Sequence, residues 1–321
     1  MVAARPLCRV ALLALLLAAC RSATAVCPAP PVVVHPGASA PELRRVSYQS
    51  AATQRERDYF LYLPRGHASE ANRMWPVLVV LHGDGERGDG KADLDYLLKN
   101  GPLYEAWIQK RDLPFIIVAP QLPLCGRDGF VPYLQNRTRA EIPKRLDQGV
   151  PERPAAFPTP PRLTGTLGAD LPPDAAVEGL PDGWSRLEGD VMAILDDVLR
   201  SQRGDASRTY LTGISYGGFG TWYLASRHPR RFAAIAPVVG YGHPDLMPPI
   251  AEARVPIWCF AGGADEAVPL RYFYPGLNRL KALGHSFRFT IQEDMNHDVW
   301  TRVYAGTDLY DWLLEHQLER R

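Results

Sequence analysis

The sequence lacks a dominant charge. Its 321 residues carry 36 Lys and Arg against 35 Asp and Glu, a net charge of +1, so no long-range field attracts nucleic acid or an acidic surface. No stripe of basic residues alternates with aromatic ones either, and we therefore expect no nucleic-acid partner. With 46% hydrophobic and 22% charged residues, the chain can bury a large core, which excludes a disordered protein.

Cysteine is also scarce. Five cysteines make no dense disulfide framework, and no Cys/His spacing predicts a structural metal site. Two of them fall in the N-terminal segment, which leaves Cys27, Cys125 and Cys259. Cys259 lies inside an apolar run, where we expect a buried thiol. The pairing of these three cysteines stays open.

No apolar run has the length of a bilayer. Residues 10–19 are apolar and follow two arginines, the pattern of an export signal over residues 1–19 that is too short to span a membrane. The run ends in Leu-Ala-Ala-Cys20, which resembles a lipobox. Cys20 would then be the lipid-modified N-terminus of an exported bacterial lipoprotein that touches the membrane only through its anchor. The alternative is cleavage after Ala25, which would give a soluble secreted or periplasmic protein.

Apolar strands alternate with helical patterns along the rest of the chain. A proline-rich tether over 20–41 leads into a single domain over 42–321. This alternation predicts the α/β class, with a mostly parallel sheet of roughly eight strands and helices on both faces. The predicted strands are 43–50, 57–63, 76–82, 114–120, 208–213, 232–239, 255–261 and 286–292. The predicted helices are 92–110, 185–201, 216–228, 275–283 and 307–318.

One long stretch has no such regularity. Residues 126–183 hold many of the 30 prolines and show no sustained period, which is unusual for a loop inside a compact domain. This insertion follows the end of a predicted strand, so it emerges on the side where reactive groups gather in parallel sheets. We expect either a lid over the site or a flexible surface loop.

Residues 209–225 combine an apolar strand, a serine flanked by glycines and a helical pattern. Gly213, Ser215 and Gly217 follow the order Gly-x-Ser-x-Gly of a nucleophile elbow, a strained turn that exposes the serine hydroxyl. A side chain at either glycine would collide with the backbone of the tight bend. We predict Ser215 as a nucleophile.

A serine hydroxyl at neutral pH needs an imidazole to accept its proton and an acid to fix the tautomer of the ring. Behind a nucleophile elbow these partners follow in the order acid, then histidine. Asp265 stands directly after the predicted strand 255–261, and His297 lies in the loop after the last predicted strand. We predict Asp265 as the acid and His297 as the base. The alternatives are Asp245 and Glu266 for the acid, and His285 and His316 for the base.

Two backbone N–H groups are needed to stabilise the oxyanion that develops during attack. Tyr216 directly follows the nucleophile, and Asp84 follows His82 and Gly83 at the end of an earlier strand, so their N–H groups are the candidates. The Asp84 carboxylate would repel the oxyanion, so we expect it to turn away, toward Arg87 or solvent. The alternative is that residues 82–88 form only a glycine-rich turn.

Six motifs stand at the ends of these predicted elements: Leu81–Gly88, Val118–Gln121, Tyr210–Gly218, Ala236–Val239, Asp265–Pro269 and His297–Trp300. Through them, residues 56–125 and 184–318 resemble the secreted branch of the α/β-hydrolase superfamily. That branch includes feruloyl-esterase-like and polyhydroxybutyrate-depolymerase-like esterases and predicted peptidases. The resemblance implies the α/β-hydrolase fold, Ser215 as nucleophile with Asp265 and His297 as its partners, and no cofactor. Two features depart from the family: Asp84, where a small residue is more common, and the insertion.

These observations predict a serine hydrolase that cleaves carboxylic esters through an acyl-enzyme. Its substrate would be a small or polymer-linked ester, with carbohydrate-linked esters and polyesters as the candidates. A serine peptidase of the same fold is the alternative within enzymes. A surface-anchored binding lipoprotein without catalytic activity is the alternative of another class. Aromatic residues cluster in the sequence near the candidate site, although Trp222 on a helix is more typical of the core. The others are Trp184, Tyr216, Tyr241 and Trp300.

Overall fold

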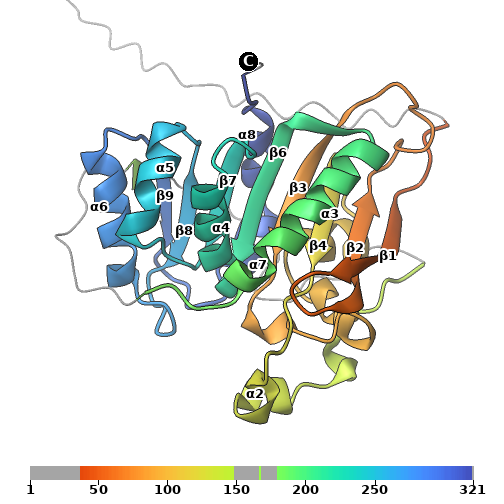
Figure 1. The fold of residues 1–321 in the computed structure, drawn as a ribbon, viewed down its shortest axis with the longest axis horizontal. Coiled ribbons are helices and arrows are strands. Elements are labelled where there is room, and N and C mark those ends of the chain that lie inside the picture. The colour runs from red at the N-terminus through yellow and green to blue at the C-terminus, as the bar shows by residue number, and fades with distance from the viewer. Residues whose placement is uncertain (1–36, 148–165, 168–178, 320–321) are drawn as a thin grey trace, which may run out of the picture. The chain divides into compact units, whose positions relative to one another are not determined.

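The computed structural model describes residues 37–147, 166–167 and 179–319. Within them the strands form one nine-stranded sheet in the order β1-β2-β4-β3-β6-β7-β8-β9-β5 (Figure 1). The strands are β1 (Glu42–Ser50), β2 (Arg55–Leu63), β3 (Trp75–Leu81), β4 (Ile116–Pro120), β5 (Thr166–Leu167), β6 (Gly204–Ile214), β7 (Ala234–Val238), β8 (Trp258–Gly262) and β9 (Arg288–Gln292). Every strand predicted from the sequence is present.

The centre of this sheet is parallel and its edges are antiparallel. Strands β4, β3, β6, β7, β8 and β9 pair in parallel with their neighbours in that order. β2 runs antiparallel to both β1 and β4. At the opposite edge the two-residue strand β5, which belongs to the insertion, pairs antiparallel with β9. The prediction of a mostly parallel α/β sheet is therefore confirmed. The strand β5 was not predicted, because the sequence around it shows no strand pattern.

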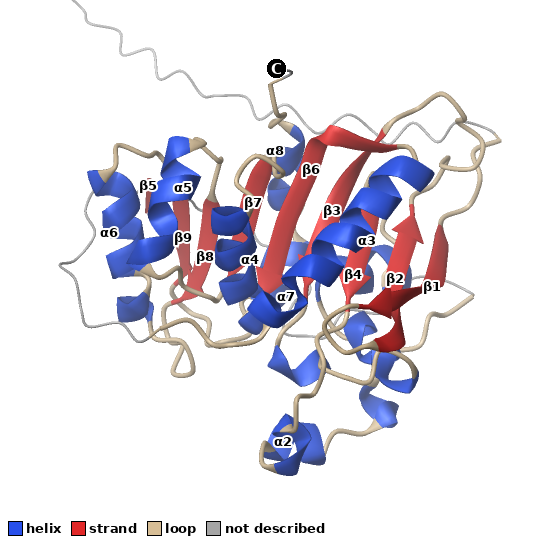
Figure 2. Ribbon diagram, viewed as in Figure 1, coloured by secondary structure: helices blue, strands red, loops and turns tan. Residues whose placement is uncertain are grey.

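Both faces of the sheet are buried, which explains why its central strands read as continuous apolar runs. In β3, Val77 and Val79 belong to one core while Leu78 and Val80 belong to the other. Helices α3, α4, α5 and α6 cover the first face, in front of the strands in Figure 2, and α7 and α8 cover the second with the segment 92–108. The helices are α1 (Gly101–Leu103), α2 (Pro132–Gln135), α3 (Glu188–Ser201), α4 (Tyr216–Arg227), α5 (Met247–Glu252), α6 (Tyr274–Ala282), α7 (Trp300–Ala305) and α8 (Asp308–Leu314).

The helix expected over 92–110 is broken into short turns. A 3₁₀ segment (Ala92–Leu98), α1 and a π-helical turn (Tyr104–Ile108) follow one another. Gly101 adopts a φ of +79°, which a regular helix does not allow, and Pro102 has no backbone N–H to donate. The last helix is also shorter than the expected 307–318, because α8 ends at Leu314.

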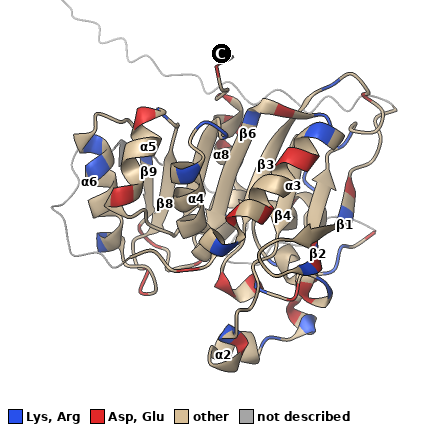
Figure 3. Cartoon of the chain, viewed as in Figure 1, with Lys and Arg blue, Asp and Glu red and all other residues tan. Residues whose placement is uncertain are grey.

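The described part of the insertion is attached to the segments that follow β3. It contains the short turns Arg127–Gly129 and Arg139–Glu141 on either side of α2, which lies apart from the sheet at the bottom of Figure 1. Charged residues of both signs gather around α2 (Figure 3). Ion pairs join Arg137 to Asp93, at 2.9 Å, and Glu141 to Lys99, at 2.6 Å. The rest of the insertion, apart from β5 and residues 179–183, lies outside the described residues.

The N-terminal predictions also fall outside the description. The export signal, Cys20, the cleavage site at Ala25, Cys27 and most of the tether precede residue 37. Among the residues that the structure does describe, no helix is long and apolar enough to cross a bilayer. The Cys125 thiol is free and exposed, whereas Cys259 is free and buried in β8, and this burial raises the pKa of its thiol. The buried Cys259 expected from the sequence is confirmed.

Candidate active site

The serine stands on a strained turn between β6 and α4. β6 ends at Ile214 and α4 begins at Tyr216, which leaves Ser215 alone between them with φ of 52° and ψ of −110°. A positive φ is unfavourable for a residue with a Cβ atom, so surrounding bonds must hold it. The N–H of Ser215 donates to the carbonyl of Val238 at 2.9 Å, and its own carbonyl accepts from the N–H of Phe219 at 3.0 Å. Hydrogen bonds to β7 and from α4 therefore hold the turn in place.

Two glycines make room for this turn. A Cβ atom on Gly213 would lie 2.2 Å from the carbonyl oxygen of Gly217, and one on Gly217 would lie 1.9 Å from that of Leu81. Both neighbours are backbone atoms, which cannot swing aside as a side chain would. The close approach expected from the sequence is thus present on both sides of Ser215, and it brings the end of β3 against the start of α4.

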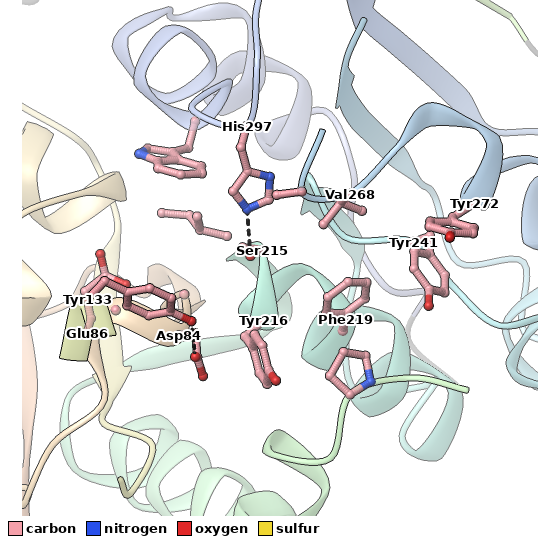
Figure 4. Close-up of a pocket in the computed structure, with 16 residues that line it drawn as sticks. Asp84, Glu86, Tyr133, Ser215, Tyr216, Phe219, Tyr241, Val268, Tyr272 and His297 are labelled. Carbon is pink, nitrogen blue, oxygen red and sulfur yellow. Dashed lines mark hydrogen bonds between the residues drawn. The ribbon is translucent and has the colours of Figure 1, made fainter. Parts of the chain in front are cut away.

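Three predicted residues meet at this turn. His297 Nε2 lies 2.9 Å from Ser215 Oγ (Figure 4), and His297 Nδ1 lies 2.8 Å from Asp265 Oδ2. The side chain of Asp265 is fully buried, and its Oδ1 accepts from the N–H groups of Ala267 and Val268 at 2.9 and 2.8 Å. Because Asp265 offers only acceptors when ionised, Nδ1 carries the ring proton and Nε2 is free to accept the serine proton.

The loops that carry the acid and the base are joined to each other. Asn296 Oδ1 accepts from the N–H of His297 at 2.9 Å and from that of Glu266 at 3.3 Å. A Cβ atom on Gly262, the last residue of β8, would lie 2.2 Å from the carbonyl oxygen of Asn296. The two loops therefore pack without space for a side chain, which fixes Asp265 relative to His297.

The alternative acids and bases make other contacts. Asp245 lies 3.3 Å from His243, and Glu266 is exposed. His285 contacts the carbonyl of Val255 at 2.9 Å, and His316 contacts that of Trp312 at 2.8 Å. The structure does not bring any of these four alternatives to Ser215.

The two candidate oxyanion donors lie on either side of the serine. Tyr216 is the first residue of α4, and Asp84 opens the 3₁₀ turn Asp84–Glu86 that follows β3. Both residues line the same cavity as Ser215. Their backbone N–H groups therefore stand at the starts of two helical turns, positions where such groups have no partner within the turn.

The Asp84 carboxylate has three side-chain partners. Its Oδ1 accepts from Arg87 Nε at 2.5 Å, and its Oδ2 accepts from Arg127 Nη2 at 2.6 Å and from Tyr133 Oη at 2.5 Å. Figure 4 shows the Tyr133 hydroxyl directed at Asp84. Burial pushes the pKa of Asp84 upward, but the hydrogen bonds from Tyr133 and Arg127 and the charge of Arg87 outweigh it and lower the pKa. The contact with Arg87 was expected, whereas the two partners from the insertion were not.

His82 braces the loop that carries Asp84. Its Nε2 accepts from the N–H of Leu122 at 2.7 Å, so Nδ1 carries the proton and donates to the carbonyl of Gly83 at 2.5 Å. Burial lowers the pKa of His82 to about 3, and the ring is therefore neutral at ordinary pH. This neutral ring joins the segment after β3 to the segment after β4.

A cavity of about 660 Å³ opens above these groups and has two chemically different ends. One end is apolar and aromatic, with Phe219, Tyr241, Val268 and Tyr272. The other end holds Asp84, Glu86 and Tyr133. Figure 4 shows Ser215 between them, with Tyr241 and Tyr272 on one side and Tyr133 on the other. A substrate bound across the serine would thus place different groups in the two ends.

Sequence reasoning found part of this lining. Tyr216, Tyr241 and Trp300 line the cavity. Trp222 is 1% exposed and donates its Nε1–H to the carbonyl of Gly240 at 2.9 Å, so it is a core residue, as its position on a helix indicated. Tyr133 and Pro181 were missed because they lie in the insertion, where no periodic pattern relates residues to the site. Among the described residues, no group of three or more His, Cys, Asp and Glu could hold a metal ion.

Comparison with solved structures identifies the fold. A thermostable esterase aligns with 86% of this chain and 63% of its own, at 23% identity and a TM-score of 0.59. The chain therefore spans somewhat less than two thirds of that esterase. An S-formylglutathione hydrolase from Agrobacterium tumefaciens aligns with 87% of this chain and 96% of its own, at 15% identity and a TM-score of 0.53. The chain has the α/β-hydrolase fold.

Two further comparisons concern the branch of α/β-hydrolases. The sequence model of the prolyl oligopeptidase family matches residues 187–248, which include Ser215. An acylaminoacyl peptidase aligns with 88% of this α/β-hydrolase chain and 43% of its own, at 15% identity and a TM-score of 0.53. No curated protein sequence matches the chain. The similar structures therefore include an esterase and a peptidase that share one fold.

Proposed function

We propose that this chain hydrolyses carboxylic esters through a serine-bound acyl-enzyme. One observation carries the proposal: Ser215 Oγ, His297 and Asp265 are in hydrogen-bond contact at 2.9 and 2.8 Å, on a strained turn that faces a cavity. Geometry of this kind lets an imidazole activate a serine hydroxyl. The α/β-hydrolase fold and the family match over residues 187–248 support the coarser assignment to serine hydrolases.

In the proposed reaction, Ser215 Oγ attacks the ester carbonyl while its proton passes to His297 Nε2. Asp265 stabilises the imidazolium that forms and keeps its Nδ1–H directed away from the substrate. The oxyanion accepts hydrogen bonds from the N–H groups of Tyr216 and Asp84. His297 then gives the proton to the departing alcohol. Water attacks the acyl-enzyme in the same way, with His297 as base, and releases the acid and the free serine.

The cavity supports an ester with one apolar group. Phe219, Tyr241 and Tyr272 form a wall of packed rings, with centroid distances of 4.9 and 5.6 Å between neighbours. Such a wall favours flat or branched apolar groups. The opposite end of the cavity has polar side chains, which suit an alcohol group that carries further hydroxyls. A carbohydrate-linked ester or a polyester segment meets both requirements.

A serine peptidase is the second candidate, and the match to the prolyl oligopeptidase family favours it. Comparing kcat/KM for acyl esters and for the matching peptide amides separates the two. An ester preference well beyond the intrinsic difference in reactivity supports the first proposal. The candidate of another class, a binding protein without catalysis, predicts no turnover of either substrate.

Replacing the nucleophile tests the reaction. Ser215→Ala should abolish hydrolysis of a short p-nitrophenyl ester and labelling by a fluorophosphonate, while the melting temperature stays near that of the parent protein. Retained hydrolysis by a folded Ser215→Ala protein would refute the assignment. Failure of the parent protein to react with the fluorophosphonate would favour the binding protein instead.

For its location, we propose an exported lipoprotein whose acyl chains are attached at Cys20. The motif Leu-Ala-Ala-Cys20 at the end of the apolar run supports this. Incorporation of labelled fatty acid should disappear in Cys20→Ala. A label that persists in that variant would refute Cys20 as the site of attachment, and a parent protein that takes up no label would favour cleavage after Ala25.

A further inference from the structure

One buried carboxyl group beside the site has no part in the proposed reaction. Glu86 closes the 3₁₀ turn that Asp84 opens, lines the catalytic cavity and is 8% exposed. Its Oε1 accepts a hydrogen bond from Asn100 Nδ2 at 2.6 Å. Its carboxyl group also interacts with the N–H of Gly83, and Oε2 is 3.1 Å from the place where a Cβ on Gly83 would stand. Glu86 therefore folds back onto the loop that presents the Asp84 N–H.

Asn100 continues this contact to the other side of the site. While its amide group donates to Glu86, its Oδ1 accepts from Trp300 Nε1 at 3.1 Å. The two residues are 200 positions apart in the sequence. Asn100 precedes α1, and Trp300 is the first residue of α7. Both polar ends of the Asn100 side chain are thus used to join the Asp84 loop to α7.

Trp300 reaches the proposed base. Its ring meets the ring of His297 edge to face, with centroids 5.4 Å apart and an interplanar angle of 88°. Trp300 lines the cavity together with His297. A chain of contacts therefore runs from Glu86 through Asn100 and Trp300 to His297. Its ends, Glu86 and His297, line the cavity, and it connects the two groups that must be held still relative to the attacking serine.

Catalysis requires that the groups at the two ends of this chain of contacts keep fixed positions. The oxyanion donor and the general base have to keep their geometry within a fraction of an ångström for the transition state to form. Hydrogen bonds are electrostatically stronger in the protein interior than in water, and a buried network of them holds its members in one arrangement. We infer that Glu86 is a positioning residue that holds the Asp84 loop and, through Asn100 and Trp300, the ring of His297 in their reactive arrangement. The inference rests on the proposed ester hydrolysis.

The test uses two changes at opposite ends of the chain of contacts. Glu86→Gln keeps the shape of the side chain, but its single amide oxygen cannot serve both Asn100 and Gly83. Trp300→Phe keeps a ring against His297 and removes the N–H that binds Asn100. Since Trp300 is only partly buried, this variant should fold even where Glu86→Gln does not. Glu105→Gln is the matched control, because Glu105 is also buried, at 3% exposed, and pairs with Arg111 at 3.1 Å without lining the cavity.

The measurements are kcat and KM on a short p-nitrophenyl ester, the rate of fluorophosphonate labelling and the melting temperature. Glu86→Gln and Trp300→Phe should each lower kcat by about 10- to 100-fold, less than the 10²- to 10³-fold loss for removing an oxyanion donor itself. KM should change little, because a short p-nitrophenyl ester has no hydroxylated alcohol to contact the polar end of the cavity. The double variant should lose less than the product of the two single losses. Glu105→Gln should alter only the melting temperature.

Several results would overturn this role. If kcat of a folded Glu86→Gln protein stays within about twofold of the parent value, the residue positions nothing. A rise in KM at constant kcat would make Glu86 a substrate-binding residue instead. Losses that multiply in the double variant would mean that the two ends act independently. A parent protein that neither turns over the ester nor reacts with the fluorophosphonate would overturn the proposed function itself, and the positioning role with it.

Discussion

Removing the Asp84 carboxylate should cost the protein a large part of its stability. Asp84→Ala leaves the guanidinium of Arg87, whose side chain is 1% exposed, without its anionic partner at 2.5 Å. An uncompensated buried charge of this kind costs about 3–5 kcal/mol. The second pair, with Arg127, is more exposed at 24% and adds at most about 1 kcal/mol after screening by solvent. We therefore expect Asp84→Ala to lower the free energy of unfolding by about 3–6 kcal/mol.

Two further variants separate charge from packing. Asp84→Asn keeps an acceptor for Arg87 but removes the charge, so its loss should be smaller, about 1.5–3 kcal/mol. In Asp84→Ala combined with Arg87→Met, neither side chain is charged, and most of the loss should be recovered because an apolar pair replaces a buried ionic one. Urea unfolding at pH 7 measures all three. A stable Asp84→Ala protein, or a double variant no better than the single one, would refute the reasoning.

The pH dependence follows from the lowered pKa of Asp84. A carboxyl group with a lower pKa in the folded state contributes stability above its unfolded pKa of about 4, and this contribution is lost as the pH falls through the folded value. The free energy of unfolding of the parent protein should therefore decline with acidification below about pH 4. The decline should be shallower in Asp84→Asn, which has no such group. Equal slopes for the two proteins would contradict the assignment of the lowered pKa to this residue.

Three other changes test the site. Asp265→Asn should lower kcat by about 10⁴-fold without unfolding the protein, because an amide that donates to His297 Nδ1 imposes the wrong tautomer; a loss below about tenfold would speak against this acid. Gly217→Ala, whose Cβ would lie 1.9 Å from a backbone oxygen, should destabilise by at least about 3 kcal/mol in urea unfolding, whereas Gly85→Ala, with nothing within 4 Å, should cost under about 0.5 kcal/mol. Tyr272→Ala should lower kcat/KM about tenfold for aromatic acyl esters and leave kcat/KM for acetate esters unchanged. Equal effects on both esters would mean that Tyr272 does not contact the acyl group.

The sheet could be predicted because its physics is local. Strands buried on both faces must be apolar throughout, as in β3, and a turn that exposes a serine needs glycines on both sides. The order of Ser215, Asp265 and His297 along the chain then follows from the ends of successive strands. Each of these inferences uses residues within a few positions of one another.

The remaining features depend on residues that are far apart in the sequence. Tyr133 reaches Asp84 across 49 positions, and Trp300 reaches Asn100 across 200. Neither pair belongs to a periodic pattern, so no window of sequence could have joined its members. The broken helix over 92–110 had a visible cause in Gly101 and Pro102, but its apolar residues alone still fitted a helical period.

The ring of His82 connects the segments that follow β3 and β4 beyond the last backbone pair of these two strands. The backbone ladder between β3 and β4 has its last pair at Val79 and Val118, yet the imidazole joins Gly83 to Leu122 well beyond that point. A side chain thus replaces a missing strand pair, and it does so only while one nitrogen donates and the other accepts. A substitution at position 82 would therefore remove this side-chain link to the Asp84 loop and leave the backbone bond from the Gly88 N–H to the Leu122 carbonyl, at 3.0 Å, in place.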